Sequence, residues 1–109
     1  ERLEHDGYIL CCATNSVRHS AIVQLTRRGF IDHLEFVFTN QDVVNPKPNT
    51  EIYLRCMIKA GVSPKETIIL EDSELGRKGA RATGSRVLEI RDSADVTYVK
   101  IRKFIENVK

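Results

Sequence analysis

Five polar residues in this sequence either follow an apolar run or precede a helical pattern. They are Thr14, Asn15, Lys47, Glu71 and Asp72. A hydroxyl and nearby backbone N–H groups can donate hydrogen bonds to phosphate oxygens, and helix N-termini add positive field. A lysine supplies a compact positive charge, and neighbouring carboxylates supply the hard oxygens that Mg²⁺ prefers. Because phosphoryl transfer depends mostly on positioning and charge neutralisation, these residue types suit phosphate chemistry.

The elements that must position these residues alternate between strand and helix. Apolar runs predict strands at residues 8–13, 35–38, 67–70 and 86–90, and helical spacing predicts helices at 17–25, 52–60, 75–83 and 98–108. Such alternation implies right-handed crossovers, so the predicted fold class is α/β, a three-layer doubly wound parallel sheet. Ligands bind beyond the carboxyl ends of the strands in such sheets. The five polar residues are therefore expected at one edge.

Length and charge narrow the function classes. A chain of 109 residues and 12.4 kDa allows one small domain. The formal net charge of +2 argues weakly against a dedicated nucleic-acid binder or an anionic membrane binder. No apolar stretch is long enough to cross a bilayer and no charged-then-apolar leader opens the chain, so a cytoplasmic location is expected. The first residue, Glu1, suggests a piece of something longer.

The cysteines and histidines show no metal-ligand spacing. The sequence has three of each and no CxxC pair. Cys11 and Cys12 are adjacent in a predicted strand, where neighbours point to opposite faces, so they cannot easily bridge each other. These features predict buried, unreactive thiols in a reducing compartment, without a disulfide or a metal role.

Each candidate residue also has a purely structural interpretation. Thr14 could cap the helix that follows it, and Lys47 could be a solvated lysine between two prolines. The segment 71–73 could cap the next helix and favour its dipole. Only the combination of these residues favours a phosphate site, because their order along the chain and their positions next to predicted strands and helices agree with one.

Three segments carry a family resemblance. ILCCATNS, NPKPNTEIYL and ILEDSELGRKGARATGSRVLEI resemble motifs two, three and four of the haloacid dehalogenase-like (HAD) hydrolases. The nearest branch is that of phosphoglycolate phosphatase-like and β-phosphoglucomutase-like enzymes. The resemblance covers nearly the whole chain, and EDSxxG after a buried strand is its most specific part. It implies a Rossmannoid core and an Mg²⁺-dependent phosphatase that acts through an aspartyl-phosphate on a small phosphorylated metabolite.

The resemblance also implies a role for each residue that matches a motif. Thr14 resembles the motif-two hydroxyl that holds the phosphoryl group, with the backbone of Asn15 beside it. Lys47 resembles the motif-three lysine, which steadies the phosphoaspartate and the phosphoryl charge. Glu71 and Asp72 resemble the motif-four acids, and Asp72 is the preferred Mg²⁺ ligand of the two.

Several positions depart from the family pattern. Where the family often has GKPAPDIF, this chain has Pro46 for Gly, Thr50 for Pro and Glu51 for Asp. Gly79 and Arg81 stand where small alanines are common. Gly79 keeps a close helix–sheet approach but costs about 1 kcal/mol of helix propensity relative to Ala.

Motif one is missing from this chain. The family's nucleophile is the first Asp of a DxDGT or DxDGS loop after the first strand. Asp6 in EHDGY is a poor substitute, because the strand follows it and Gly7 reads as a helix stop. In the resembled fold the motif-one strand lies between the motif-two and motif-four strands, so without it the sheet has a gap with unpaired edges. Residues 1–109 then form the C-terminal part of a HAD-like core, without the motif-one segment and the cap domain.

Three explanations of the gap stay open. The chain is part of a longer enzyme, which we favour; or another polypeptide donates the strand; or the two flanking strands pair directly. The alternative functions are a non-catalytic module that binds phosphate or Mg²⁺ and, less favoured, a phosphomutase. The motif order disfavours a receiver domain, and no GxGxxG follows a strand as a dinucleotide binder requires.

Overall fold

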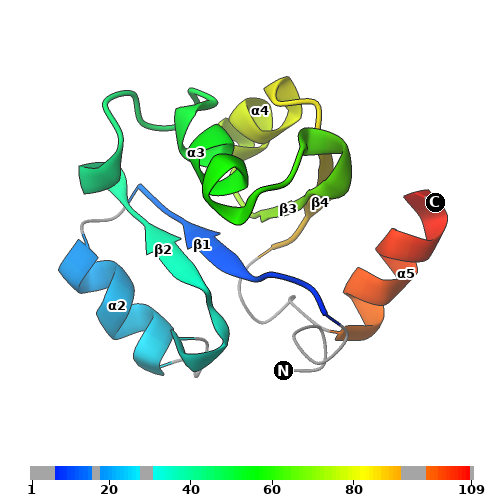
Figure 1. Cartoon of the computed structure of the whole chain (residues 1–109), viewed down its shortest axis with the longest axis horizontal. Coiled ribbons are helices and arrows are strands. Elements are labelled where there is room, and N and C mark those ends of the chain that lie inside the picture. The colour runs from blue at the N-terminus through cyan, green and yellow to red at the C-terminus, as the bar shows by residue number, and fades with distance from the viewer. Residues whose placement is uncertain (1–6, 16–17, 28–30, 92–97, 109) are drawn as a thin grey trace.

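The computed structural model of this chain describes residues 7–15, 18–27, 31–91 and 98–108. Strands and helices alternate along the described segments (Figure 1). The elements are β1 (Cys11–Ala13), α2 (Arg18–Arg27), β2 (Phe36–Phe38), α3 (Glu51–Ala60), β3 (Ile68–Glu71), α4 (Glu74–Ala82), β4 (Arg86–Glu89) and α5 (Tyr98–Val108). Short 3-10 turns are η1 (Ile31–His33), η2 (Asn40–Asp42) and η3 (Pro64–Glu66). The predicted α/β alternation is confirmed.

The strands form two separate parallel pairs. β1 pairs with β2, and Cys11 lies opposite Phe36. β3 pairs with β4, and Ile68 lies opposite Arg86. Within the described segments β1 and β3 are not paired with each other. The explanation that the two strands flanking the missing motif pair directly is therefore wrong. The parallel sheet is therefore incomplete at the predicted place.

The first strand is shorter than predicted. It begins at Cys11, although the apolar run begins at Tyr8. One more bond, from Glu35 N to Leu10 O at 2.7 Å, extends the contact with the β2 segment. Tyr8 and Ile9 remain 37% and 50% exposed. A strand continues only where a neighbour accepts its backbone bonds, and here a described neighbour lies along one edge of β1 alone.

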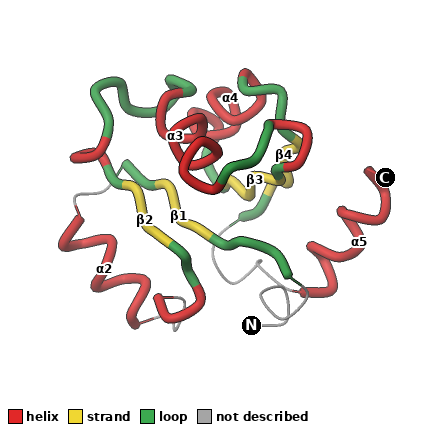
Figure 2. Tube along the Cα trace, viewed as in Figure 1, coloured by secondary structure: helices red, strands yellow, loops and turns green. Residues whose placement is uncertain are grey.

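The core lies between two helices and both strand pairs. α3 and α4 lie over the strands (Figure 2). They contribute the buried residues Ile52, Tyr53, Met57 and Ala80, which pack against partly buried side chains of every strand, namely Ala13, Phe38, Ile69 and Val87. Both pairs thus contact the same apolar cluster, which holds them together although no strand of the described segments pairs with both.

Local contacts explain where the helices near the site begin and end. Asn49 Oδ1 accepts a hydrogen bond from Glu51 N at 2.9 Å, whereas Thr50 makes no side-chain cap. α3 ends at Gly61, whose φ of 74° is in the left-handed region that favours glycine. Ser73 Oγ accepts a bond from Gly76 N at 3.0 Å and caps α4. The predicted capping role of the 71–73 segment thus falls to Ser73.

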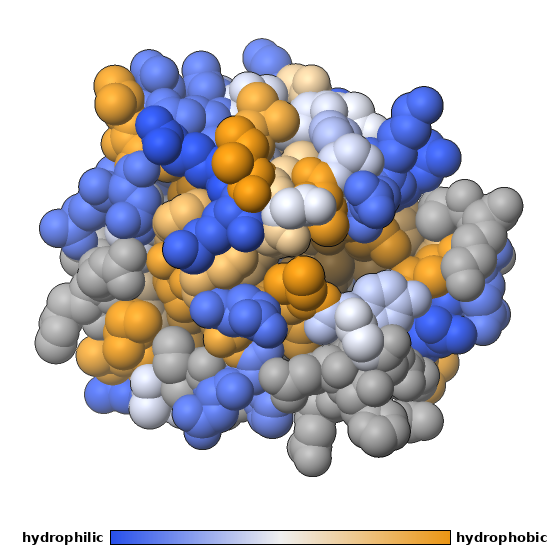
Figure 3. Space-filling model, viewed as in Figure 1, coloured by the Kyte–Doolittle hydropathy of each residue, from blue (hydrophilic) through white to orange (hydrophobic). Residues whose placement is uncertain are grey.

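The exposed surface carries both polar and apolar side chains (Figure 3). Apolar side chains gather in the middle of one face, between α3 and the β1–β2 pair (Figure 3).

Among the helices of the described segments, none has both the length and the apolar character needed to cross a membrane. The predictions for Asp6 and for the helix that ends at Gly7 fall wholly or partly outside the described residues.

Candidate phosphate and metal site

Lys47 and Glu71 form a buried ion pair at the carboxyl end of β3. Lys47 Nζ lies 2.7 Å from Glu71 Oε2, and the two side chains are only 10% and 7% exposed. Glu71 is the last residue of β3, whereas Lys47 comes from the loop before α3. The lysine is therefore not a solvated loop residue, and two of the predicted site residues lie in direct contact.

Tyr53 of α3 completes this contact. Its hydroxyl lies 2.6 Å from Glu71 Oε2 and 3.0 Å from the carbonyl oxygen of Gly76. Lys47 Nζ lies over the Tyr53 ring, 5.1 Å from its centre. The helical spacing places Tyr53 in the core but does not reveal its polar role. The available signal was its hydroxyl, since a buried tyrosine hydroxyl usually finds a partner.

The charges in this cluster reinforce one another. Burial and the hydrogen bond to Glu71 raise the pKa of Tyr53, so its hydroxyl stays protonated and donates. Burial by itself would raise the pKa of Glu71, but the hydrogen bonds from Lys47 and Tyr53 outweigh it and lower that pKa below its ordinary value. Glu71 is therefore an ionised carboxylate, and its Oε2 is held by two donors.

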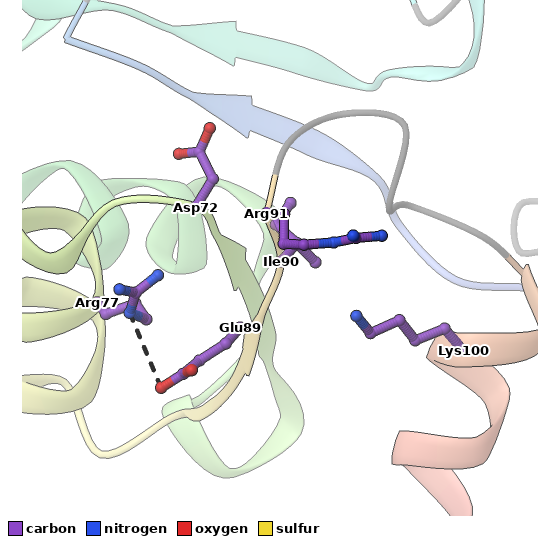
Figure 4. A pocket seen from close by; sticks show the side chains of 6 residues that line it. All are labelled: Asp72, Arg77, Glu89, Ile90, Arg91 and Lys100. Carbon is purple, nitrogen blue, oxygen red and sulfur yellow. Dashed lines mark ion pairs between the residues drawn. The ribbon is translucent and has the colours of Figure 1, made fainter.

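Asp72 gives the site its exposed carboxylate. It follows Glu71 directly and is exposed, and its carboxylate points away from the Arg77–Glu89 pair (Figure 4). Glu71 Oε1 accepts only weaker bonds, from Asp72 N at 3.2 Å and Ser73 Oγ at 3.5 Å. Asp72 and Glu71 supply carboxylate oxygens, which are the kind of ligand that Mg²⁺ prefers. Within the described ranges, no group of three or more Asp, Glu, His or Cys residues gathers to hold a metal.

The end of β1 reaches the same place. Thr14 N donates to Phe38 O at 3.0 Å and extends the β1–β2 ladder. The next residue, Asn15, accepts a hydrogen bond from Lys47 N through its side-chain Oδ1 at 3.2 Å. Asn15 thus links the end of β1 to the lysine loop, with its side chain and not only its backbone. These contacts join Asn15, Lys47 and Glu71, and the other two predicted residues, Thr14 and Asp72, adjoin them in the chain.

A cleft of about 520 Å³ lies beside Asp72. Its lining residues are Asp72, Arg77, Glu89, Ile90, Arg91 and Lys100. Arg77 Nε lies 3.8 Å from Glu89 Oε1, and Lys100 extends from α5 toward Arg91 (Figure 4). The lining thus carries charges of both signs, and Arg77 is also paired with Glu74 at 3.0 Å.

The cysteines differ from one another more than the sequence predicts. All three are free; Cys11 is exposed, Cys12 is half-buried and Cys56 is buried. A hydrogen bond from the Cys56 thiol lowers the pKa of Cys11, although partial burial opposes it. Burial raises the pKa of Cys12. The prediction of a buried thiol is therefore wrong for Cys11, which is exposed, whereas the prediction that the thiols are unreactive stays a prediction.

The rates of alkylation should distinguish Cys11 from Cys12. At pH 8 we expect Cys11 to react with iodoacetamide faster than Cys12, since Cys11 is exposed and its lowered pKa leaves more of the nucleophilic thiolate. Mass mapping of peptides after short labelling measures both rates. A Cys56→Ala variant removes the donor and should slow Cys11. Equal rates at Cys11 and Cys12 would contradict the described contact.

The fold and this arrangement define a class of protein. The haloacid dehalogenase-like hydrolase family model matches residues 1–90, so the chain belongs to that family. The expected family and its α/β core are thereby confirmed.

Curated relatives and a solved structure also match this chain. A Thermotoga maritima "Phosphorylated carbohydrates phosphatase" is 29% identical over 75 residues, which are 69% of this chain and 35% of that protein. The Escherichia coli "Fructose-1-phosphate phosphatase YqaB" is 28% identical over 87 residues, 80% of this chain and 46% of that protein. A HAD-superfamily hydrolase of subfamily IA from Geobacter sulfurreducens superposes with a TM-score of 0.66 at 30% identity, covering 72% of this chain and 40% of that one. The chain thus spans less than half the length of these relatives.

Proposed function

We propose that the protein carrying this chain is an Mg²⁺-dependent phosphatase that hydrolyses a small phosphorylated metabolite through an aspartyl-phosphate. The buried Lys47–Glu71 pair beside the exposed Asp72 is the observation that supports this most strongly. Membership of the hydrolase family supports it independently. The names of two relatives favour a sugar phosphate as substrate. A cytoplasmic location is part of the same proposal.

Each residue has a task in this proposal. The Lys47 ammonium neutralises charge on the phosphoryl group, and the Thr14 hydroxyl with the backbone N–H groups beside it donates to phosphoryl oxygens. Glu71 holds Lys47 in place through Oε2. Asp72 and Glu71 Oε1 would hold Mg²⁺, which when bound supplies further charge neutralisation on the phosphate.

We further propose that the nucleophilic aspartate arrives on a strand that lies between β1 and β3. The two strand pairs are separate, and the exposed Tyr8 and Ile9 lead into β1. Apolar surface lies between α3 and β1 in Figure 3. A strand in this position would satisfy both edges, and its carboxyl end would face Lys47. We favour a segment of the same protein as its source over a strand donated by another polypeptide.

An Asp72→Asn substitution tests the function. In the complete protein, we expect turnover of p-nitrophenyl phosphate with Mg²⁺ to fall by at least about 100-fold, because a neutral amide is a poor ligand for a hard cation. The melting temperature should change little, since Asp72 is exposed. Glu74→Gln, an exposed acid two positions further on, is the matched control and should retain turnover.

The outcomes separate the alternatives. Full activity of Asp72→Asn would overturn the metal role. A complete protein that binds phosphate and Mg²⁺ but hydrolyses no phosphate ester would favour the non-catalytic module instead. Isomerisation of a sugar phosphate without release of phosphate would favour the phosphomutase.

A further inference from the structure

We propose that Tyr53 is a positioning residue, which fixes the Glu71 carboxylate and, through it, the Lys47 ammonium. This inference rests on the proposed phosphatase function for its catalytic meaning, but its geometry stands independently. Tyr53 matches none of the residues to which the sequence motifs assign a role. It lies on α3 and is 4% exposed.

Two donors meet at one oxygen. Lys47 Nζ and the Tyr53 hydroxyl lie 2.7 Å and 2.6 Å from Glu71 Oε2. Because both are bound to Oε2, Glu71 Oε1 is left toward Asp72 N and Ser73 Oγ. Tyr53 therefore decides which carboxylate oxygen faces the lysine and which faces the candidate metal ligand. Without the hydroxyl, the carboxylate could rotate about its last bond and take Lys47 with it.

The surroundings of Tyr53 make it a rigid support. Its neighbours Ile52 and Met57 on α3 are buried in the core. Its ring lies beneath Lys47 Nζ, a contact that attracts the cation independently of the hydroxyl. On the other side of the carboxylate, Gly76 leaves room because a Cβ there would overlap the Glu71 carboxyl group. Glu71 is thus enclosed between α3 and α4.

A Tyr53→Phe substitution isolates the hydroxyl, since it keeps the ring and its contact with Lys47. In the complete protein, we expect kcat for p-nitrophenyl phosphate to fall about tenfold with KM little changed, as for other groups that orient a reacting side chain. Tyr8→Phe is the matched control, because the Tyr8 hydroxyl contacts Arg102 NH1 at 3.3 Å and not the site.

A second readout does not depend on activity. In ¹H–¹⁵N spectra of lysine side chains, the buried Lys47 ammonium should give a resolved signal, assigned by its loss in Lys47→Arg. Tyr53→Phe should broaden or shift that signal, and Tyr8→Phe should leave it in place. A variant with merely weakened packing would lower the melting temperature without moving this signal selectively.

The unchanged protein provides a check that needs no variant. The Tyr53 hydroxyl proton should exchange slowly with solvent and show a nuclear Overhauser effect to the Lys47 ammonium. Absence of that proton signal, or an unchanged Lys47 signal and kcat in Tyr53→Phe, would overturn the inference. If the complete protein turns over no phosphate ester, the proposed function fails, whereas the two NMR measurements still decide the role of Tyr53.

Discussion

Replacement of Lys47 by Met should lower the free energy of unfolding by about 3–5 kcal/mol, the usual cost of leaving a buried charge without its partner. Glu71 is 6% exposed, and in this variant it would keep only the Tyr53 hydroxyl as a strong donor. Turnover by the complete protein should also fall roughly 100- to 1,000-fold, since the cation that faces the phosphoryl group is gone. Urea unfolding and steady-state kinetics measure the two effects.

A double variant separates the two effects. Lys47→Met with Glu71→Gln removes both charges and should recover much of the stability, but none of the turnover. The stability lost in Lys47→Met should be larger at pH 7 than near pH 4.5, because protonation of Glu71 removes the unpaired charge. In the unchanged protein, stability depends on pH in the opposite direction. The pKa of Glu71 is lowered from 4.5, so the ionised Glu71 stabilises the fold above that pH, and this stabilisation is lost as the pH falls. A stable Lys47→Met variant at pH 7 would contradict the buried pair.

Gly79→Ala should destabilise the protein by up to about 2 kcal/mol, which is the typical overpacking cost of about 1–3 kcal/mol less the gain in helix propensity. A Cβ at Gly79 would lie 2.5 Å from the Pro48 carbonyl oxygen and 3.0 Å from its carbon. Both are backbone atoms, so α4 or the Lys47–Pro48 loop must move. The cost of this movement is offset only in part by the gain of about 1 kcal/mol that helix propensity offers to Ala over Gly. Since Lys47 lies beside Pro48, turnover should fall as well.

A variant in the same helix provides the control for this prediction. Lys78→Ala changes the exposed neighbour of Gly79 and should alter stability by no more than about 0.5 kcal/mol. Thermal unfolding of both variants makes the comparison. A Gly79→Ala variant more stable than the parent would mean that helix propensity outweighs the contact with Pro48.

The element order and the family were available from the sequence, because both depend on local patterns. Apolar runs and helical spacing depend only on neighbours in the chain, and EDSxxG after a buried strand is a short motif. The edge at which Asn15, Lys47 and Glu71 meet was also predictable, since carboxyl ends of parallel strands share one side of a sheet. The missing motif one even predicted where the sheet would be open.

Tertiary structure alone decided the finer points, because they depend on residues far apart in the chain. The Tyr53 hydroxyl and Glu71 Oε2 meet only when α3 packs over β3. The contact of Cys11 with Cys56 likewise depends on the packing of β1 against α3. The sequence predicts a close approach of Gly79 to the sheet, but the atoms that a Cβ there would meet belong to Pro48 and Asn49 in the loop before α3. Hydrophobic packing brings such groups together, and no local pattern records which partners will meet.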